Sequence, residues 1–214
     1  MSLPGRFPAL YPILDASFLD TAENREALLG KTVRDLAEAG VGILQYRNKT
    51  GSEAEILADA HLMRDAVGSR MRLLLNDWPE LAVSAGFDGV HVGQMDLSPT
   101  EARGIVGPSK IVGVSTHNEA QLRAADLQPV DYIAFGPVYA TATKANPDPV
   151  VGLDGLRAAR GLTGKPLVAI GGITRENVAL VWQAGADSVA AISAIFSAGG
   201  DPAKLAQDFL AIRR

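Results

Sequence analysis

Eight short apolar segments recur along the chain, separated by stretches with helical spacing or composition. Several of the apolar segments lack the alternation of a sheet with one wet face, so we expect parallel strands buried on both faces. The predicted strands are Leu10–Leu14, Ile43–Arg47, Arg72–Asn76, Gly89–Val92, Ile111–Val114, Tyr132–Phe135, Leu167–Ile170 and Ser188–Ile192. The predicted helices include Asn24–Ala39, Glu53–Val67, Glu80–Ala85, Asn118–Ala125, Leu153–Ala159, Glu176–Ala184 and Pro202–Ile212.

Turn and cap residues divide these segments into repeated units. Ser52, Thr174 and Asp201 are predicted helix N-caps, and Ala-Gly pairs at 39–40, 85–86 and 184–185 are typical helix ends. Eight strand–helix units in 214 residues predict an α/β fold, a (β/α)8 TIM barrel that forms a single domain over residues 1–214. The main alternative, an open doubly wound sheet, would need a G-x-G-x-x-G motif after the first strand, and the chain has none there.

Composition narrows the classes of function. The net charge is −4 and no basic stripe is present, so nucleic acid is not expected as a partner. The chain has no cysteine, which excludes a thiolate nucleophile and disulfides. No apolar stretch approaches the roughly 20 residues of a membrane span, and the N-terminus lacks the pattern of a signal peptide. We therefore expect a cytoplasmic protein without a membrane partner.

Polar residues gather where the predicted strands end, which is the active-site face of a TIM barrel. Gln45, Arg47 and Lys49 alternate at the end of the second strand, so an extended backbone projects them to one side. Two cations and an amide there suit an anionic ligand. Ordinary surface cations at a solvated strand end are the alternative interpretation.

Two aspartates follow the next two strands. Asp77 and Asp96 would lie on neighbouring loops of the same barrel face. Two carboxylates repel a phosphate unless a cation lies between them, and Mg²⁺ bound by carboxylates, water and phosphate oxygens fits this requirement. The alternatives are helix capping by Asp77 and turn formation by Asp96.

Other strand ends carry further candidates. Ser115 is a hydroxyl donor after the fifth strand, whereas His91 is expected to be a hydrogen-bonded structural residue. His117 is a candidate for proton transfer, although Thr116 or Asn118 beside it suits a helix cap.

The later loops suit phosphate groups. The long loop over residues 136–152 contains two threonines and Lys144, which can bind phosphate oxygens under a closing lid. Glycines at 171 and 172 leave the backbone open after the seventh strand, where barrels commonly bind phosphate.

Taken in order, the motifs resemble those of the thiamine-phosphate synthase (thiamine-phosphate pyrophosphorylase) family. The resemblance covers about Gln45 to Ile195 and rests on the motifs Q-x-R-x-K, N-D, D-G-V-H-x-G-Q-x-D, G-V-S-T-H, G-P-V-x-x-T-x-T-K, I-G-G-I and I-S-A-I. It implies a transferase of thiamine biosynthesis that joins 4-amino-5-hydroxymethyl-2-methylpyrimidine diphosphate to 4-methyl-5-(2-phosphoethyl)thiazole, or to the carboxylated thiazole. The products that the resemblance implies are thiamine phosphate and pyrophosphate, formed by Mg²⁺-assisted dissociative loss of pyrophosphate.

The resemblance also implies the site residues. The pyrimidine diphosphate is expected at Gln45, Tyr46, Arg47, Asn48, Lys49, Asn76, Ser115 and Lys144. The thiazole phosphate is expected at Thr141, Ala142, Thr143, Gly172, Ile192 and Ser193, and Mg²⁺ at Asp77 and Asp96. Arg47, Lys49, Ser115 and Lys144 are the expected catalytic groups. Met95 and Trp78 depart from the family pattern.

Two relatives of the same barrel type remain as alternatives. A thiazole tautomerase would use His117 as proton carrier, and a regulatory relative would bind metabolites without turnover. Retention of Asp77, Asp96, Lys49 and Lys144 argues against the tautomerase, and retention of the expected magnesium ligands argues against the regulatory relative. The implied ligands are small molecules, and a homo-oligomer is compatible with this interpretation.

Overall fold

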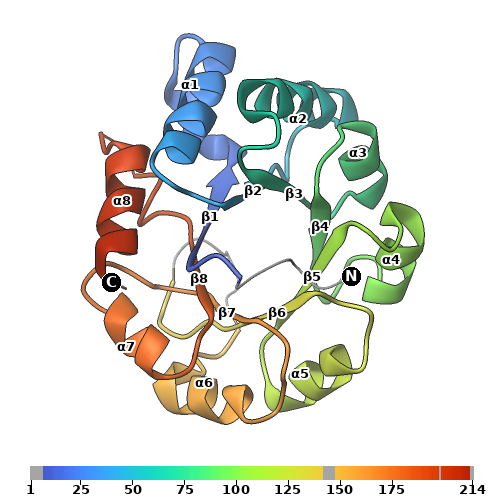
Figure 1. The fold of residues 1–214 in the computed structure, drawn as a ribbon, viewed down its shortest axis with the longest axis vertical. Coiled ribbons are helices and arrows are strands. Elements are labelled where there is room, and N and C mark those ends of the chain that lie inside the picture. Colours follow the sequence, from blue (N-terminus) through green and yellow to red (C-terminus); the bar gives the residue numbers. More distant parts are fainter. Residues whose placement is uncertain (1–6, 142–147, 198, 213–214) are drawn as a thin grey trace.

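The computed structural model describes residues 7–141, 148–197 and 199–212. Eight parallel strands pair in chain order and β8 closes on β1, with the helices packed around the outside (Figure 1). The predicted TIM barrel is thereby confirmed, and closure excludes the open doubly wound sheet. No helix among these residues is both long and apolar enough to cross a bilayer.

The element bounds agree closely with the sequence analysis. The strands are β1 (Leu10–Asp15), β2 (Ile43–Arg47), β3 (Arg72–Asn76), β4 (Gly89–Val92), β5 (Ile111–Thr116), β6 (Tyr132–Phe135), β7 (Leu167–Ala169) and β8 (Ser188–Ala191). The helices are η1 (Ala16–Thr21), α1 (Arg25–Glu38), α2 (Glu53–Val67), α3 (Pro79–Ser84), α4 (Pro99–Val106), α5 (Glu119–Asp126), α6 (Gly152–Arg160), α7 (Val178–Gln183) and α8 (Pro202–Ile212).

Local capping explains most helix boundaries. Ser52 forms a capping box with Glu55 at the start of α2, as its position predicts. Asp201 accepts backbone N–H bonds at the start of α8. The prediction for Thr174 is wrong, because α7 begins four residues later, at Val178. Helix α4 is implied by the eight predicted strand–helix units but is not among the helix ranges named from the sequence, although Ser98 and Glu101 form a second capping box there.

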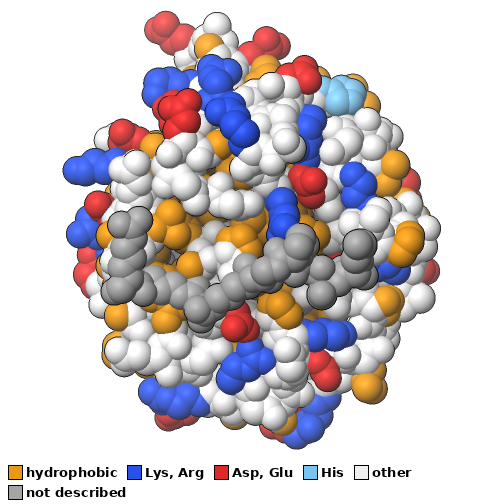
Figure 2. Space-filling view, viewed as in Figure 1, with side chains coloured by type: hydrophobic (Ala, Val, Ile, Leu, Met, Phe, Trp, Pro, Cys, Tyr) orange, Lys and Arg blue, Asp and Glu red, His pale blue; other side chains and the backbone are white. Residues whose placement is uncertain are grey.

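The core has two layers. The larger layer lies between strands and helices, and the smaller fills the barrel interior. The interior cluster consists of Phe7, Tyr11, Ile13, Ile43, Leu74, Ile111, Tyr132, Ala134, Val168 and Ala190. Figure 2 shows hydrophobic side chains at the centre of one face and charges of both signs interspersed around the ring of helices.

Candidate active site

The closed barrel brings the predicted polar residues of β2 to β5 to one rim. In the strand register, Asp15 lies opposite Arg47 and Asn76 lies opposite His91. Because all strands are parallel, these positions reach the same end of the barrel. The sequence prediction of a shared rim for these residues therefore agrees with the strand register.

Asp77 is the centre of a charged cluster on this rim. Its carboxylate forms an ion pair with the Nζ of Lys49 and lies close enough to the Asp96 carboxyl to share a hydrogen bond. The backbone φ of Asp77 is 69°, and Asp77 is the only non-glycine residue with a left-handed backbone in the described part of the chain. Helix α3 has no side-chain cap, so the capping interpretation of Asp77 is wrong.

The electrostatics of the pair fit a cation site. Burial and the neighbouring Asp96 raise the pKa of Asp77 to about 6, although Lys49 acts in the opposite direction. Asp96 also accepts a hydrogen bond from the Gly93 N–H at 2.7 Å, so it forms the turn that the alternative interpretation proposed. Within the described residues no group of three or more His, Cys, Asp or Glu could hold a metal. A pair of carboxylates suits Mg²⁺, which keeps waters and phosphate oxygens in its shell.

Arg47 is held by a residue that the sequence analysis did not assign. Its guanidinium forms an ion pair with Asp15, which also accepts hydrogen bonds from the N–H and hydroxyl of Ser17. Burial alone would raise the pKa of Asp15, but the Ser17 hydrogen bonds and Arg47 together lower it. The sequence signal that could have identified Asp15 as a rim residue is its position directly after the first predicted strand.

Ser115 and Gln45 face the barrel interior and join one polar network. The Ser115 hydroxyl lies 2.8 Å from His91 Nε2, and the Gln45 amide donates to the Tyr11 hydroxyl at 2.8 Å. Both ring nitrogens of His91 are hydrogen-bonded, and burial lowers its pKa to about 4. The expectation that His91 is a structural residue agrees with these contacts.

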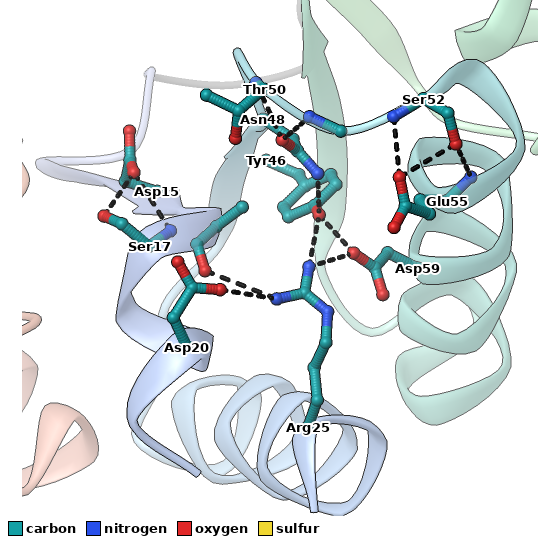
Figure 3. Close-up of polar contacts among 12 residues, drawn as sticks. Asp15, Ser17, Asp20, Arg25, Tyr46, Asn48, Thr50, Ser52, Glu55 and Asp59 are labelled. Atoms are coloured by element: carbon teal, nitrogen blue, oxygen red, sulfur yellow. Dashed lines mark hydrogen bonds and ion pairs between the residues drawn. The ribbon is translucent and has the colours of Figure 1, made fainter.

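The side chains of Tyr46 and Asn48 join a hydrogen-bond network with Arg25 and Asp59 (Figure 3). Tyr46 donates to Asp59 of α2, and Arg25 of α1 donates to the same carboxylate at 2.6 Å. Asn48 Nδ2 donates to the Tyr46 hydroxyl, and its Oδ1 accepts backbone N–H bonds from residues 50 and 51. Both side chains thus hold the β2–α2 loop, and the backbone groups at these two positions are the ones we assign to a ligand.

His117 joins two loops. Its Nδ1 lies 2.7 Å from the carbonyl oxygen of Gly136, and its Nε2 lies 3.5 Å from the Asp148 carboxylate. Asn118 caps helix α5 by accepting the Gln121 N–H. The imidazole therefore ties the end of β5 to the loop after β6, and proton transfer by His117 stays a prediction.

The loop after β6 packs closely against the glycines after β7. A Cβ on Gly171 would lie 2.5 Å from Pro137 Cβ, and one on Gly172 would lie 2.3 Å from the Ala140 carbonyl oxygen. Both glycines also have positive φ. Loop packing thus requires glycine at both positions, and the access for a phosphate expected there stays a prediction.

The remaining predicted residues divide between two regions. Gly172 follows β7, and Ile192 and Ser193 follow its neighbour β8, so these positions adjoin. Thr141 belongs to the loop after β6, whereas Ala142, Thr143 and Lys144 lie outside the described residues. Met95, one departure from the family pattern, is 96% exposed.

Fold and rim together define a (β/α)8-barrel enzyme with its charged residues at the C-terminal ends of the strands. The chain belongs to the thiamine monophosphate synthase family, whose model matches residues 10–195. It is therefore a transferase of thiamine biosynthesis.

Individual relatives agree with this assignment. The chain is 54% identical over 207 residues to the thiamine-phosphate synthase of Koribacter versatilis, covering 97% of this chain and 96% of that protein. It is 40% identical to the thiamine-phosphate synthase of Vibrio campbellii, over 86% of this chain and 90% of that protein. The solved thiamine phosphate pyrophosphorylase of Pyrococcus furiosus superposes with a TM-score of 0.82 at 28% identity, covering 95% and 94% of the two chains.

Proposed function

We propose that the charged rim binds a pyrimidine diphosphate and stabilises pyrophosphate as it leaves, in the thiamine-phosphate synthase reaction. The observation that carries this proposal is the cluster of Lys49, Asp77 and Asp96, with Arg47 nearby on the same strand as Gln45. In the reaction, the methylene C–O bond breaks and its electron pair stays with pyrophosphate. The thiazole nitrogen lone pair then forms the new C–N bond. The products are thiamine phosphate and pyrophosphate.

Asp15 and Asp77 hold the two cationic side chains of the rim in place before the substrate binds. Arg47 pairs with Asp15 and Lys49 pairs with Asp77, so neither cation has to be ordered from solvent when the diphosphate arrives. Negative charge grows on the leaving group as the C–O bond breaks. Positioned cations stabilise that growing charge more than they stabilise the bound substrate, which lowers the barrier.

Asp77 and Asp96 are the proposed Mg²⁺ ligands. When bound, the ion would neutralise charge on the diphosphate oxygens. The raised pKa of Asp77 supports this assignment, because two adjacent carboxylates at neutral pH are stabilised by a cation between them.

The remaining assignments follow the family resemblance. Gln45, Asn76, Ser115 and the backbone at 46 and 48 are proposed to bind the pyrimidine diphosphate, together with Lys144. The thiazole phosphate is assigned to Thr141, Ala142, Thr143, Gly172, Ile192 and Ser193. Adjacent loops after β7 and β8 support the phosphate assignment, since this is a common phosphate site in barrels.

The location of the reaction, the domain organisation and the partners of the protein are also proposed, on chemical grounds. Diphosphate substrates carry several charges and do not cross a bilayer unaided, so we place the reaction in the cytoplasm. We also propose that residues 1–214 act as one domain on small molecules, without nucleic acid or membrane. A homo-oligomer is compatible with this proposal, and light scattering after size exclusion would measure it.

The direct test mixes both substrates with the purified protein and measures thiamine phosphate and pyrophosphate. We expect equal amounts of both products with Mg²⁺ and little of either after chelation. Pyrophosphate without thiamine phosphate would identify a hydrolase instead, and the absence of both products would reject the proposed reaction.

A further inference from the structure

A continuous chain of hydrogen bonds crosses the barrel interior from Gln45 to Ser115. Gln45 Nε2 donates to the Tyr11 hydroxyl, which lies 2.8 Å from the Tyr132 hydroxyl. The Tyr132 hydroxyl lies 2.7 Å from His91 Nδ1, and His91 Nε2 lies 2.8 Å from Ser115 Oγ. These side chains come from five different strands. We call this set of five residues the interior relay.

The interior relay is enclosed by apolar packing. Tyr11 is 1% exposed and Tyr132 is fully buried. The Phe7 ring packs against both tyrosines, with centroid distances of 6.2 and 5.0 Å. Gly113 leaves the space that the Tyr132 ring fills, because a Cβ there would lie 1.9 Å from Tyr132 Cζ. Water therefore has little access to the middle of the relay, so its protons have to be satisfied by its own members.

The orientation of the Gln45 amide, with Nε2 toward the Tyr11 hydroxyl, sets the direction of the relay. The Gln45 Nε2 group donates and cannot accept, so the single Tyr11 proton has the Tyr132 oxygen as its acceptor. The Tyr132 proton must then go to His91 Nδ1, which is consequently unprotonated. His91 carries its proton on Nε2 and donates to Ser115 Oγ. The reverse direction would leave the Tyr11 proton without an acceptor among the described residues.

The last proton of the relay is that of Ser115. Since its oxygen accepts from His91, its own O–H is directed to a different acceptor. Ser115 is partly exposed at the rim, whereas the other four residues are buried. We propose that the interior relay fixes Ser115 as a hydrogen-bond donor to the bound pyrimidine diphosphate, with Tyr11, Tyr132 and His91 as positioning residues. This inference rests on the proposed function for the identity of the ligand.

The tautomer of His91 tests the inference without any substrate. In ¹⁵N-labelled protein, long-range ¹H–¹⁵N correlation spectra distinguish the two neutral tautomers, and His91→Gln identifies the signals. We expect the Nε2–H tautomer. A predominant Nδ1–H tautomer would overturn the inference, even if the enzyme makes thiamine phosphate.

Two tyrosine variants separate the relay from general effects on the protein. Tyr11→Phe removes the proton that Tyr132 accepts, so we expect the His91 signals to change toward a mixture of tautomers. Tyr46→Phe is the matched control, because Tyr46 bonds to Asp59 outside the barrel interior and should leave the His91 signals unchanged. His91 signals that are the same in Tyr11→Phe as in Tyr46→Phe would contradict the relay.

A double-mutant cycle tests whether the relay acts through Ser115. We expect Ser115→Ala to lower kcat about 100-fold and Tyr132→Phe about 10-fold. Because Tyr132 acts only by orienting Ser115, adding Tyr132→Phe to Ser115→Ala should cause no further loss. Losses that multiply, or a Ser115→Ala enzyme with unchanged kcat, would refute the positioning role.

Discussion

The ammonium group of Lys49 and the carboxylate of Asp77 form an ion pair that links the β2–α2 loop to the end of β3. Asp96 lies against the same carboxyl group. One cation thus faces two carboxylates, an arrangement with an excess negative charge that a divalent metal can balance. The charge balance of this cluster determines how the rim responds to metal, pH and substitution.

Removing Asp96 should abolish Mg²⁺-dependent turnover. We expect Asp96→Ala to lower kcat/KM by at least about 100-fold, because one of the two proposed protein ligands of the metal is lost. Pyrophosphate release over a range of Mg²⁺ concentrations measures the effect. Asp154→Ala is the control, since that carboxylate is 98% exposed on α6. Turnover of Asp96→Ala at the wild-type rate would refute the metal assignment.

Mg²⁺ affinity should fall in acid. The pKa of Asp77 is raised to about 6 in the metal-free protein, so the carboxyl gains a proton as pH falls through that value. A protonated carboxyl has to lose its proton before it binds metal, so the apparent Kd for Mg²⁺ should rise as pH decreases from 7 to 5. Calorimetric titration with Mg²⁺ at several pH values measures this. An affinity independent of pH over this range would contradict the assignment.

Gly113 should not tolerate a methyl group. In Gly113→Ala the new Cβ would overlap the Tyr132 ring, and such overpacking costs about 1–3 kcal/mol or more. Gly104→Ala is the matched control in helix α4, where nothing lies within 4 Å of the added Cβ. This control should be neutral or stabilised by about 0.5–1 kcal/mol. Urea unfolding of both variants measures the difference.

The part-buried ion pair of Arg25 and Asp59 (Figure 3) should contribute more to stability than a surface pair. Asp59→Asn removes the carboxylate that Arg25 and the Tyr46 hydroxyl share and is expected to cost about 1–3 kcal/mol. The exposed pair of Lys31 and Asp35 is the comparison, where Asp35→Asn should cost less than about 0.5 kcal/mol. Equal losses in thermal unfolding would show that burial of the Asp59 pair has no special effect.

Local patterns were sufficient to predict the barrel. Strands such as Ile43–Arg47 are bounded by turn residues and have continuous apolar character, so their limits follow from sequence alone. The start of helix α4 could also have been predicted, because Ser98, Pro99 and Glu101 form a typical helix N-terminal sequence. The alternation of β2 likewise indicates that Tyr46 faces away from Gln45 and Arg47, a distinction that the family motif does not make.

Long-range contacts were beyond local reasoning. The hydroxyls of Tyr11 and Tyr132 are bonded across a separation of 121 residues, and no spacing rule relates the two positions. The pairing of Arg47 with Asp15 likewise depends on the register between β1 and β2. Contacts of this kind are set by barrel closure and side-chain packing, which a single sequence does not encode in its local pattern.

The most direct test of the charged rim measures how Mg²⁺ and pyrophosphate affect each other's binding. Titration calorimetry with pyrophosphate should be performed with and without Mg²⁺, on the wild type and on Asp96→Ala. We expect Mg²⁺ to tighten pyrophosphate binding at least about 10-fold in the wild type, and this coupling to disappear in the variant. Equal pyrophosphate affinity with and without Mg²⁺ in the wild type would contradict the proposal that Asp77 and Asp96 hold a metal against the leaving group.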